Sequence, residues 1–197
     1  MSHLTDDASH LANQLLIAMP GMADDMFAGT VVYLCEHNSK GAMGLVINRP
    51  TDIDLAHLFD KIDLKLEIAP LIHQPVYFGG PVQTERGFVL HPHFSDISYS
   101  SSLTVPGGLS MTTSKDVLEA VSKGNGPSKF MMTLGYAGWG EGQLEDEIAR
   151  NGWLNVSTDI DHISEIIFDT PFEDRYQKVM SIIGIDPSHL SGDVGHA

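Results

Sequence analysis

Apolar residues fall in short runs with two different periods along the chain. Runs of about four to eight apolar or β-branched residues, bounded by Gly, Pro or Asn, are typical of buried strands. Such runs predict strands over residues 14–19, 30–36, 42–48, 75–79, 87–91, 103–105, 109–112 and 153–156, with another run starting at 130. The turn-forming cluster 37–41 separates the second and third runs, and therefore predicts an antiparallel hairpin.

Helical spacing appears in other stretches. Residues 52–62 carry an apolar stripe, residues 113–123 carry a second, and a short acidic segment around Leu144 and Ile148 carries a third. Thr170 and Glu173 form a capping-box pattern at the start of a last helix that ends at Gly184. Residues 159–168 fit a helix or a strand equally well.

Several predicted strands are joined by turns too short for a helical crossover. This pattern favours an α+β fold with a mixed, largely antiparallel sheet over a doubly wound parallel sheet. Hydrophobic residues make up 42% of the 197-residue chain, enough for one core. We expect a flexible N-terminal segment at 1–12, a single domain at 13–186 and a flexible tail at 187–197.

The stretch 130–153 is the most distinctive in the chain. An apolar run ends in glycines (Gly135, Gly138, Gly140 and Gly142) and a short helix follows. Such a turn can present main-chain N–H groups to an anion, or it can be only a tight corner. Glu141 would repel an anion there, which favours the structural corner.

Two further loops carry candidate ligand contacts. Arg49 follows an apolar strand in a chain with only four arginines, so it can clamp an anion or pair with one of 26 acidic side chains. The ion pair is favoured. The connection at Gly79 and Gly80 can line the same cleft, although a wide hairpin is the simpler interpretation. The candidate cleft comprises Asn48, Arg49, Gly79, Gly80, Gly138 and Gly140.

No catalytic motif or metal site emerges from the sequence. Cys35, His37 and Glu141 are candidates if the protein is an enzyme, but a lone Cys in a strand is usually a small buried hydrophobe. His91 and His93 with Asp96 supply too few ligands for a closed zinc site. We therefore expect no catalytic residue, metal or cofactor.

Charge narrows the range of partners. The chain has 26 Asp and Glu residues against 11 Lys and Arg residues, a net charge of −15. Without clustered cations, direct binding to nucleic acid or to an anionic membrane is disfavoured. One cysteine, no signal-peptide pattern and no apolar run of about 20 residues indicate a cytoplasmic protein.

Five segments together resemble the YqgE/AlgH family, and their likeness covers about residues 12–186. They are residues 13–22, 27–37, 44–50, 76–82 and 134–145. The resemblance implies a bacterial cytosolic α+β protein with a coiled, bifurcated mixed sheet and about four or five packed helices. It implies no catalytic residues. Some family members are labelled transcriptional regulators without a recognised DNA-binding module.

Three functional hypotheses follow from these observations. The first is a non-enzymatic binding or regulatory protein that acts through the glycine-rich cleft or a protein-contact surface, with an unidentified protein or small molecule as its partner. The second is an unrecognised enzyme acting on a small metabolite. The third is a transcriptional regulator that acts indirectly through a protein partner. The oligomeric state cannot be read from the sequence.

Overall fold

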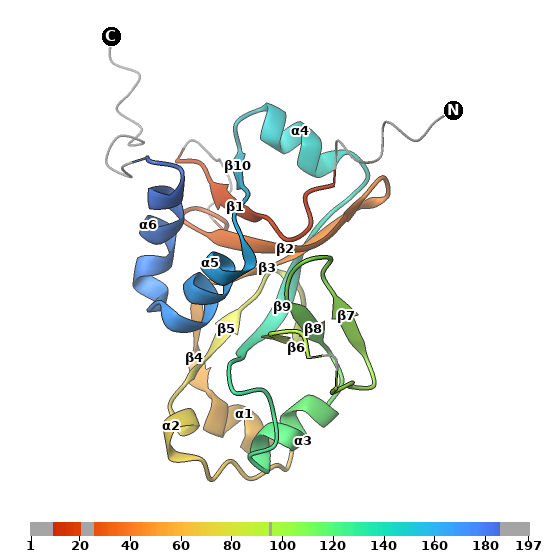
Figure 1. Ribbon diagram of the computed structural model, residues 1–197, viewed down its shortest axis with the longest axis vertical. Coiled ribbons are helices and arrows are strands. Elements are labelled where there is room, and N and C mark those ends of the chain that lie inside the picture. Colours follow the sequence, from red (N-terminus) through yellow and green to blue (C-terminus); the bar gives the residue numbers. More distant parts are fainter. Residues whose placement is uncertain (1–9, 21–25, 95, 186–197) are drawn as a thin grey trace.

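A computed structural model describes residues 10–20, 26–94 and 96–185 of the chain (Figure 1). Residues 1–9 of the predicted N-terminal segment, and the whole predicted tail at 187–197, lie outside the described residues. The proposed domain limits at 13 and 186 stay a prediction.

Ten strands in the described part form one branched sheet. They are β1 (Leu15–Ala18), β2 (Val31–Asn38), β3 (Gly41–Val46), β4 (Pro50–Asp54), β5 (Pro75–Phe78), β6 (Val82–His91), β7 (Ser102–Thr104), β8 (Ser110–Thr112), β9 (Met131–Trp139) and β10 (Trp153–Val156). The main path runs β10-β1-β2-β3-β9-β6-β8-β7, and β4 joins through β5. Among the described pairs, β5 with β9 is the parallel one.

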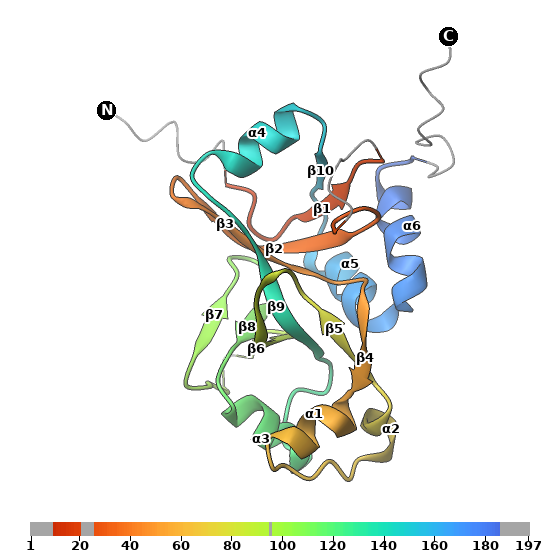
Figure 2. The same cartoon turned by 180° about the vertical axis from the view of Figure 1, so that it is seen from behind.

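Strand β9 is the branch point of the sheet. Its C-terminal half pairs with β3, where Trp139 lies opposite Ala42. Its N-terminal half lies between β5 and β6, with Thr133 opposite both Tyr77 and Phe88. Figures 1 and 2 show β9 running from the lower part of the molecule, beside β5 and β6, into the upper part, beside β3. The predicted α+β fold with a bifurcated, largely antiparallel mixed sheet is confirmed.

The predicted strand at 130 does not end at its first glycine. It continues through Gly135 and Gly138 to Trp139. Gly135 has φ +77°, a left-handed conformation that glycine adopts without steric cost. This residue lets β9 leave the β5–β6 side and join β3 without breaking.

Six α-helices and one π-helical turn occur in the described residues. They are α1 (Leu55–Lys61), α2 (Ala69–Ile72), α3 (Asp116–Ser122), α4 (Gln143–Ala149), α5 (Ile160–Ser164), the π-helix η2 (Glu165–Asp169) and α6 (Phe172–Ile182). Two of them, α2 and α5, are only four and five residues long, which explains why sequence patterns predicted four or five helices.

Two predicted helix starts are wrong. The helix expected from 52 begins at Leu55, because residues 50–54 form β4 and the Asp54 side chain caps α1 by accepting from the His57 N–H at 3.0 Å. The capping box at Thr170 does not form either. Its hydroxyl donates to the Glu165 carbonyl at 2.8 Å instead, and the N-cap of α6 is Pro171, with no side-chain hydrogen bond.

Three groups of buried side chains hold these elements together. Helices α5, η2 and α6 cover one face of the β1–β3 region through residues such as Ile163, Val179 and Met180. Helix α4 covers the other face, where Trp139 packs edge-on against Trp153. Helices α1 and α3 close the β6–β9 region. No helix in the described ranges is long and apolar enough to cross a membrane.

Candidate functional site

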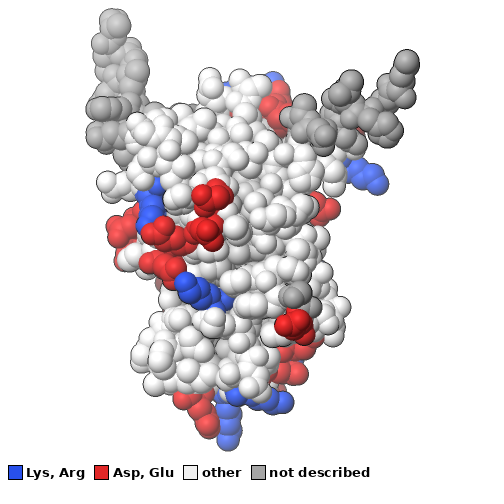
Figure 3. All heavy atoms as spheres, viewed as in Figure 1, with Lys and Arg blue, Asp and Glu red and all other residues white. Residues whose placement is uncertain are grey.

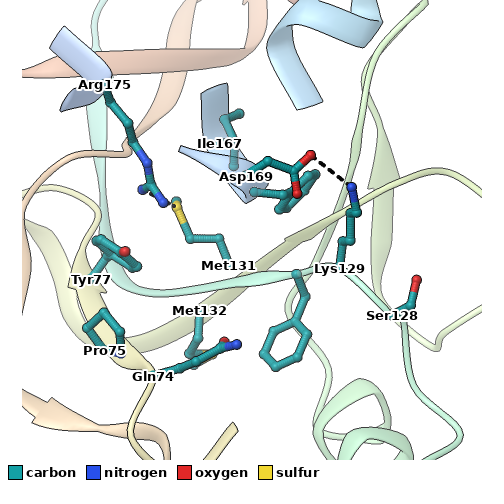
Figure 4. A pocket seen from close by; sticks show the side chains of 12 residues that line it. Gln74, Pro75, Tyr77, Ser128, Lys129, Met131, Met132, Ile167, Asp169 and Arg175 are labelled. Atoms are coloured by element: carbon teal, nitrogen blue, oxygen red, sulfur yellow. Dashed lines mark hydrogen bonds and ion pairs between the residues drawn. The ribbon is translucent and has the colours of Figure 1, made fainter. Parts of the chain in front are cut away.

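A pocket of about 340 Å³ opens between the start of β9 and the η2–α6 segment (Figure 4). Its lining comes from four separate parts of the chain, which only the tertiary structure brings together. The lining residues are Gln74, Pro75, Tyr77, Ser128, Lys129, Phe130, Met131, Met132, Ile167, Phe168, Asp169 and Arg175.

The lining divides into a buried floor and an exposed polar mouth. Tyr77, Met131, Met132, Ile167 and Arg175 form the floor, and each of them is at least 93% buried. The exposed lining residues are Gln74, Ser128, Lys129 and Asp169. Three of these five floor residues are apolar, and a few placed polar groups are a feature of small-molecule sites.

Arg175 is the charged residue of the floor, and its side chain is held by main-chain carbonyls. Its Nε atom donates to the Thr170 carbonyl at 3.0 Å, and its Nη1 atom donates to the Ile47 carbonyl and contacts the Met131 sulfur. The guanidinium carbon lies 5.0 Å from the centre of the Tyr77 ring. Figure 4 shows Arg175 reaching from α6 towards Met131 and Tyr77.

Among the described residues, no carboxylate lies within 4.0 Å of the Arg175 guanidinium. The residue is only 5% exposed. Burial lowers the pKa of Arg175 from its ordinary value, and the neighbouring Tyr77 and Glu173 oppose that shift. Arginine stays protonated in proteins and buried charges are normally paired, yet this positive charge is in direct contact with no carboxylate of the described residues.

The π-helical turn η2 builds the wall opposite Arg175. It contributes Ile167 to the floor, Phe168 to the side and Asp169 to the mouth. A π-helical turn widens the backbone by one residue per turn and is frequent at functional sites. Here it is followed directly by Thr170, whose carbonyl holds Arg175.

A salt bridge lies across the mouth. Lys129 Nζ is 2.8 Å from Asp169 Oδ2, and the two side chains are 50% and 46% exposed (Figure 4). Exposed ion pairs of this kind contribute only about 0–1 kcal/mol to stability. Either side chain of this salt bridge can therefore exchange its partner for another charged group at little cost.

The six residues of the predicted cleft lie in different places. Asn48 accepts from the Val31 N–H at 2.9 Å and donates to the Gly29 carbonyl at 3.0 Å. Arg49 donates to the carbonyls of Met26 and Ala28. Both side chains thus hold the segment before β2, and the favoured ion pair of Arg49 with an acidic side chain does not occur among the described residues.

Gly79 and Gly80 pack main chain against main chain. A Cβ on Gly79 would lie 2.4 Å from the Gly135 carbonyl oxygen, and one on Gly80 would lie 2.0 Å from the Tyr136 carbonyl carbon. These glycines are needed where the β5–β6 connection crosses β9, and this contact leaves no space for a ligand between them.

Gly138 and Gly140 lie further along the same strand. Gly138 borders a shallow hollow of about 580 Å³ beside the β2–β3 hairpin, together with Tyr136, Glu36 and Lys40. Gly140 precedes α4, and its N–H donates to the Gln143 side chain at 2.9 Å. The predicted cleft residues therefore do not converge on one of the pockets described here.

The residues weighed for catalysis are also accounted for. Cys35 is 2% exposed, and burial raises the pKa of its thiol to about 12, which is the reverse of what a nucleophile needs. His37 is buried between the Leu11 N–H and the Glu145 carboxylate. His91 and His93 bond different hydroxyls, those of Thr112 and Ser110.

The pocket residues were missed because their signal is weak in the sequence. Arg175 lies three residues after Phe172 and four before Val179, within the inward stripe of the last helix. An arginine at an inward helical position of an arginine-poor chain was the available clue.

Comparisons with known proteins agree on one family. A family model described as AlgH-like matches residues 15–188. A UPF0301 protein of Ralstonia nicotianae is 68% identical over 98% of each chain, and one of Cupriavidus metallidurans is 69% identical over 95% of this chain and 96% of its own. The solution structure of the AlgH protein from Pseudomonas aeruginosa matches with TM-score 0.74 and 48% identity, covering 100% of this chain and 99% of that one.

A second solved structure supports the fold alone. A crystal structure of a Corynebacterium diphtheriae protein matches with TM-score 0.68 and 19% identity, over 92% of this chain and 91% of that one. The family model and the close relatives together span nearly the whole chain. The motifs of the sequence and these matches lead to the same conclusion: the chain belongs to the AlgH-like family, the YqgE/AlgH family that its motifs resemble.

Proposed function

We propose that the protein is a non-enzymatic binding protein that recognises a small anionic molecule in the Arg175 pocket. The observation that carries the proposal is the buried Arg175 guanidinium without a carboxylate partner among the described residues. Arg175 Nε and Nη1 already donate to the carbonyls of Thr170 and Ile47, which leaves Nη2 to donate to an oxygen of a carboxylate or phosphate in a charge-assisted hydrogen bond. A pocket of about 340 Å³ limits the ligand to the size of a small metabolite.

The chemistry of the lining favours binding over catalysis. Among the described residues, its side chains bond to one another where Lys129 meets Asp169 and where Arg175 meets Met131. Neither contact joins a hydroxyl or thiol nucleophile to a base, which acyl or phosphoryl transfer would require. A single buried thiol supports a reducing setting, and we propose that the protein acts in the cytoplasm.

Thermal denaturation with a panel of small carboxylates and phosphates is the first experiment. A ligand that binds only the folded protein raises its melting temperature as its concentration rises. We expect a subset of the carboxylates to do so. If no carboxylate or phosphate stabilises the protein at millimolar concentration, the proposal is overturned.

Variants then locate the binding. Ser128→Trp places a bulky ring at the exposed mouth and is expected to abolish binding without unfolding the protein. Arg175→Lys keeps the charge but removes the planar fork, and is expected to weaken binding by about tenfold or more. Arg86→Lys, an exposed arginine stacked 5.7 Å from the Phe88 ring, is the matched control. Binding that Ser128→Trp leaves unchanged would place the ligand elsewhere.

A further inference from the structure

The pocket carries a cation on its floor and an ion pair at its mouth. The floor holds the buried Arg175, whereas the mouth holds the half-exposed carboxylate of Asp169, paired with Lys129. Further carboxylates lie on the same segment of the chain: Glu165 on η2, where it pairs with Lys178, and Glu173 and Asp174 in the first turn of α6. Figure 3 shows carboxylates gathered on the side of this face where α5, η2 and α6 lie.

A ligand with two negative groups would have to displace Asp169 from Lys129. One carboxylate would be attracted to Arg175, but a second would leave the Asp169 carboxylate without its cation, on a segment with further carboxylates. A ligand with an anionic group at one end and a cationic group next to it matches both the floor and the mouth.

The Lys129 ammonium shows that Asp169 at the mouth of the pocket can hold a cationic group. It lies 2.8 Å from Asp169, in a pair so exposed that it adds little stability. Replacing this ammonium by that of a ligand therefore costs little, since the freed Lys129 side chain returns to water. The salt bridge occupies the position that a ligand ammonium would take.

The remaining surface fixes the third part of the ligand. Met131, whose sulfur contacts Arg175, and Phe168 both line the pocket, and Met131 is 3% exposed. A methionine side chain adapts to varied apolar shapes, and the Phe168 ring adds contact area.

From this arrangement we infer that the pocket binds a free amino acid with an apolar side chain. Its carboxylate pairs with Arg175, its ammonium displaces Lys129 from Asp169, and its side chain packs on Met131 and Phe168. The inference rests on the proposed function, because it names the class of anion that the Arg175 pocket takes.

Titration calorimetry with three forms of one amino acid tests the inference. Leucine, methionine and phenylalanine are compared with their N-acetyl and carboxamide derivatives, which lack the ammonium and the carboxylate respectively. We expect the free amino acid to bind at least about tenfold more tightly than either derivative, since each lacks one charge-assisted contact. An N-acetyl derivative that binds as tightly as the free amino acid overturns the inference while the proposed function survives.

Two substitutions at the mouth of the pocket are expected to change the binding affinity in opposite directions. Asp169→Asn is expected to weaken binding of the free amino acid by about tenfold and to leave binding of the N-acetyl derivative unchanged. Lys129→Ala is expected to strengthen binding of the free amino acid, because the substitution removes the ammonium that competes for Asp169. Asp146→Asn, which breaks the exposed pair with Arg150 at 3.3 Å on α4, is the control and is expected to change nothing.

The outcomes separate the two proposals. Weaker binding after Lys129→Ala would mean that Lys129 itself holds the ligand. That result would overturn the inference that the ligand is a zwitterionic amino acid. Tighter binding of a dicarboxylate than of any amino acid would do the same, while anion binding at Arg175 would stand. If neither amino acids nor other carboxylates and phosphates bind, both proposals fail.

Discussion

The carbonyl group of Gly80 lies directly against the α-carbon of Gly135. A Cβ on Gly135 would be 2.3 Å from the Gly80 oxygen, and a Cβ on Gly80 would be 2.2 Å from the Tyr136 oxygen. Real Cβ atoms do not approach main-chain atoms so closely, and neither strand can move without breaking the pairing of β9 with its neighbours. This contact locks the branch point of the sheet.

Gly80→Ala is therefore expected to lower the free energy of unfolding by about 3 kcal/mol or more, through strain and overpacking. Gly80 also has φ +155°, which disfavours a side chain. Gly142→Ala is the matched control, because its φ is +73° but open space surrounds its α-carbon. It should cost about 1 kcal/mol. Urea denaturation measures both, and equal losses would contradict the close contact.

The contact between His37 and Glu145 predicts a dependence of stability on pH. The Leu11 N–H donates to His37 Nδ1 at 2.8 Å, so the ring proton is on Nε2 and is donated to the Glu145 carboxylate. This hydrogen bond from His37 is the main cause that lowers the pKa of Glu145. A lowered pKa means that the carboxylate stabilises the fold above its ordinary pKa of about 4.3, and loses that effect as the pH falls through the lowered value.

Glu145→Gln is accordingly expected to lower the free energy of unfolding at pH 7 by about 0.5–1 kcal/mol, a small value because the carboxylate is partly exposed. The variant and the native chain should converge as the pH falls below about 4. Denaturation from pH 7 to pH 3 checks this. Glu141→Gln, an exposed residue just before α4, is the control. A gap that stays constant with pH would refute the electrostatic origin.

The Cys35 thiol is expected to be inert in the folded protein. It is 2% exposed, its Sγ faces the Tyr33 carbonyl at 3.7 Å, and burial raises its pKa to about 12. A thiol reagent at pH 8 should react with it only after denaturation, at least about a hundredfold faster in urea than in buffer. Rapid labelling of the native chain would restore Cys35 as a candidate nucleophile.

Asn48 is expected to matter for stability more than Arg49. Asn48→Ala leaves the Val31 N–H and the Gly29 carbonyl without their partner, at a cost of about 1–3 kcal/mol. Arg49→Ala should cost less, because water can replace its contacts at the exposed carbonyls of Met26 and Ala28. Denaturation gives the two values, and hydrogen exchange at the Val31 amide should accelerate in the Asn48 variant. A reversed ranking would show that Arg49 is the main anchor.

The local pattern of the chain was sufficient for many of its elements. The β2–β3 hairpin could be predicted because both strands and their turn are adjacent in sequence. The last helix could be predicted from its apolar stripe, and Gly184 ends it in the left-handed conformation, with φ +72°. Residues 159–168 stayed ambiguous, because a short helix followed by a π-helical turn has neither the regular spacing of a helix nor the alternation of a strand.

Long-range contacts decided the rest. The sequence identified Gly79, Gly80 and Gly135 as unusual, but whether a glycine admits a ligand or another strand depends on what lies opposite its α-carbon, and here it is β9 meeting the β5–β6 connection. Lys129 and Asp169 are 40 residues apart, and Arg175 joins them only because α6 packs across Ile47 and Met131. By itself the sequence determined the family, the acidic balance and the strands other than β4, part of which lies in a stretch with helical spacing. Only the tertiary structure placed one buried cation in a pocket, because the pairing of a charge depends on neighbours in space.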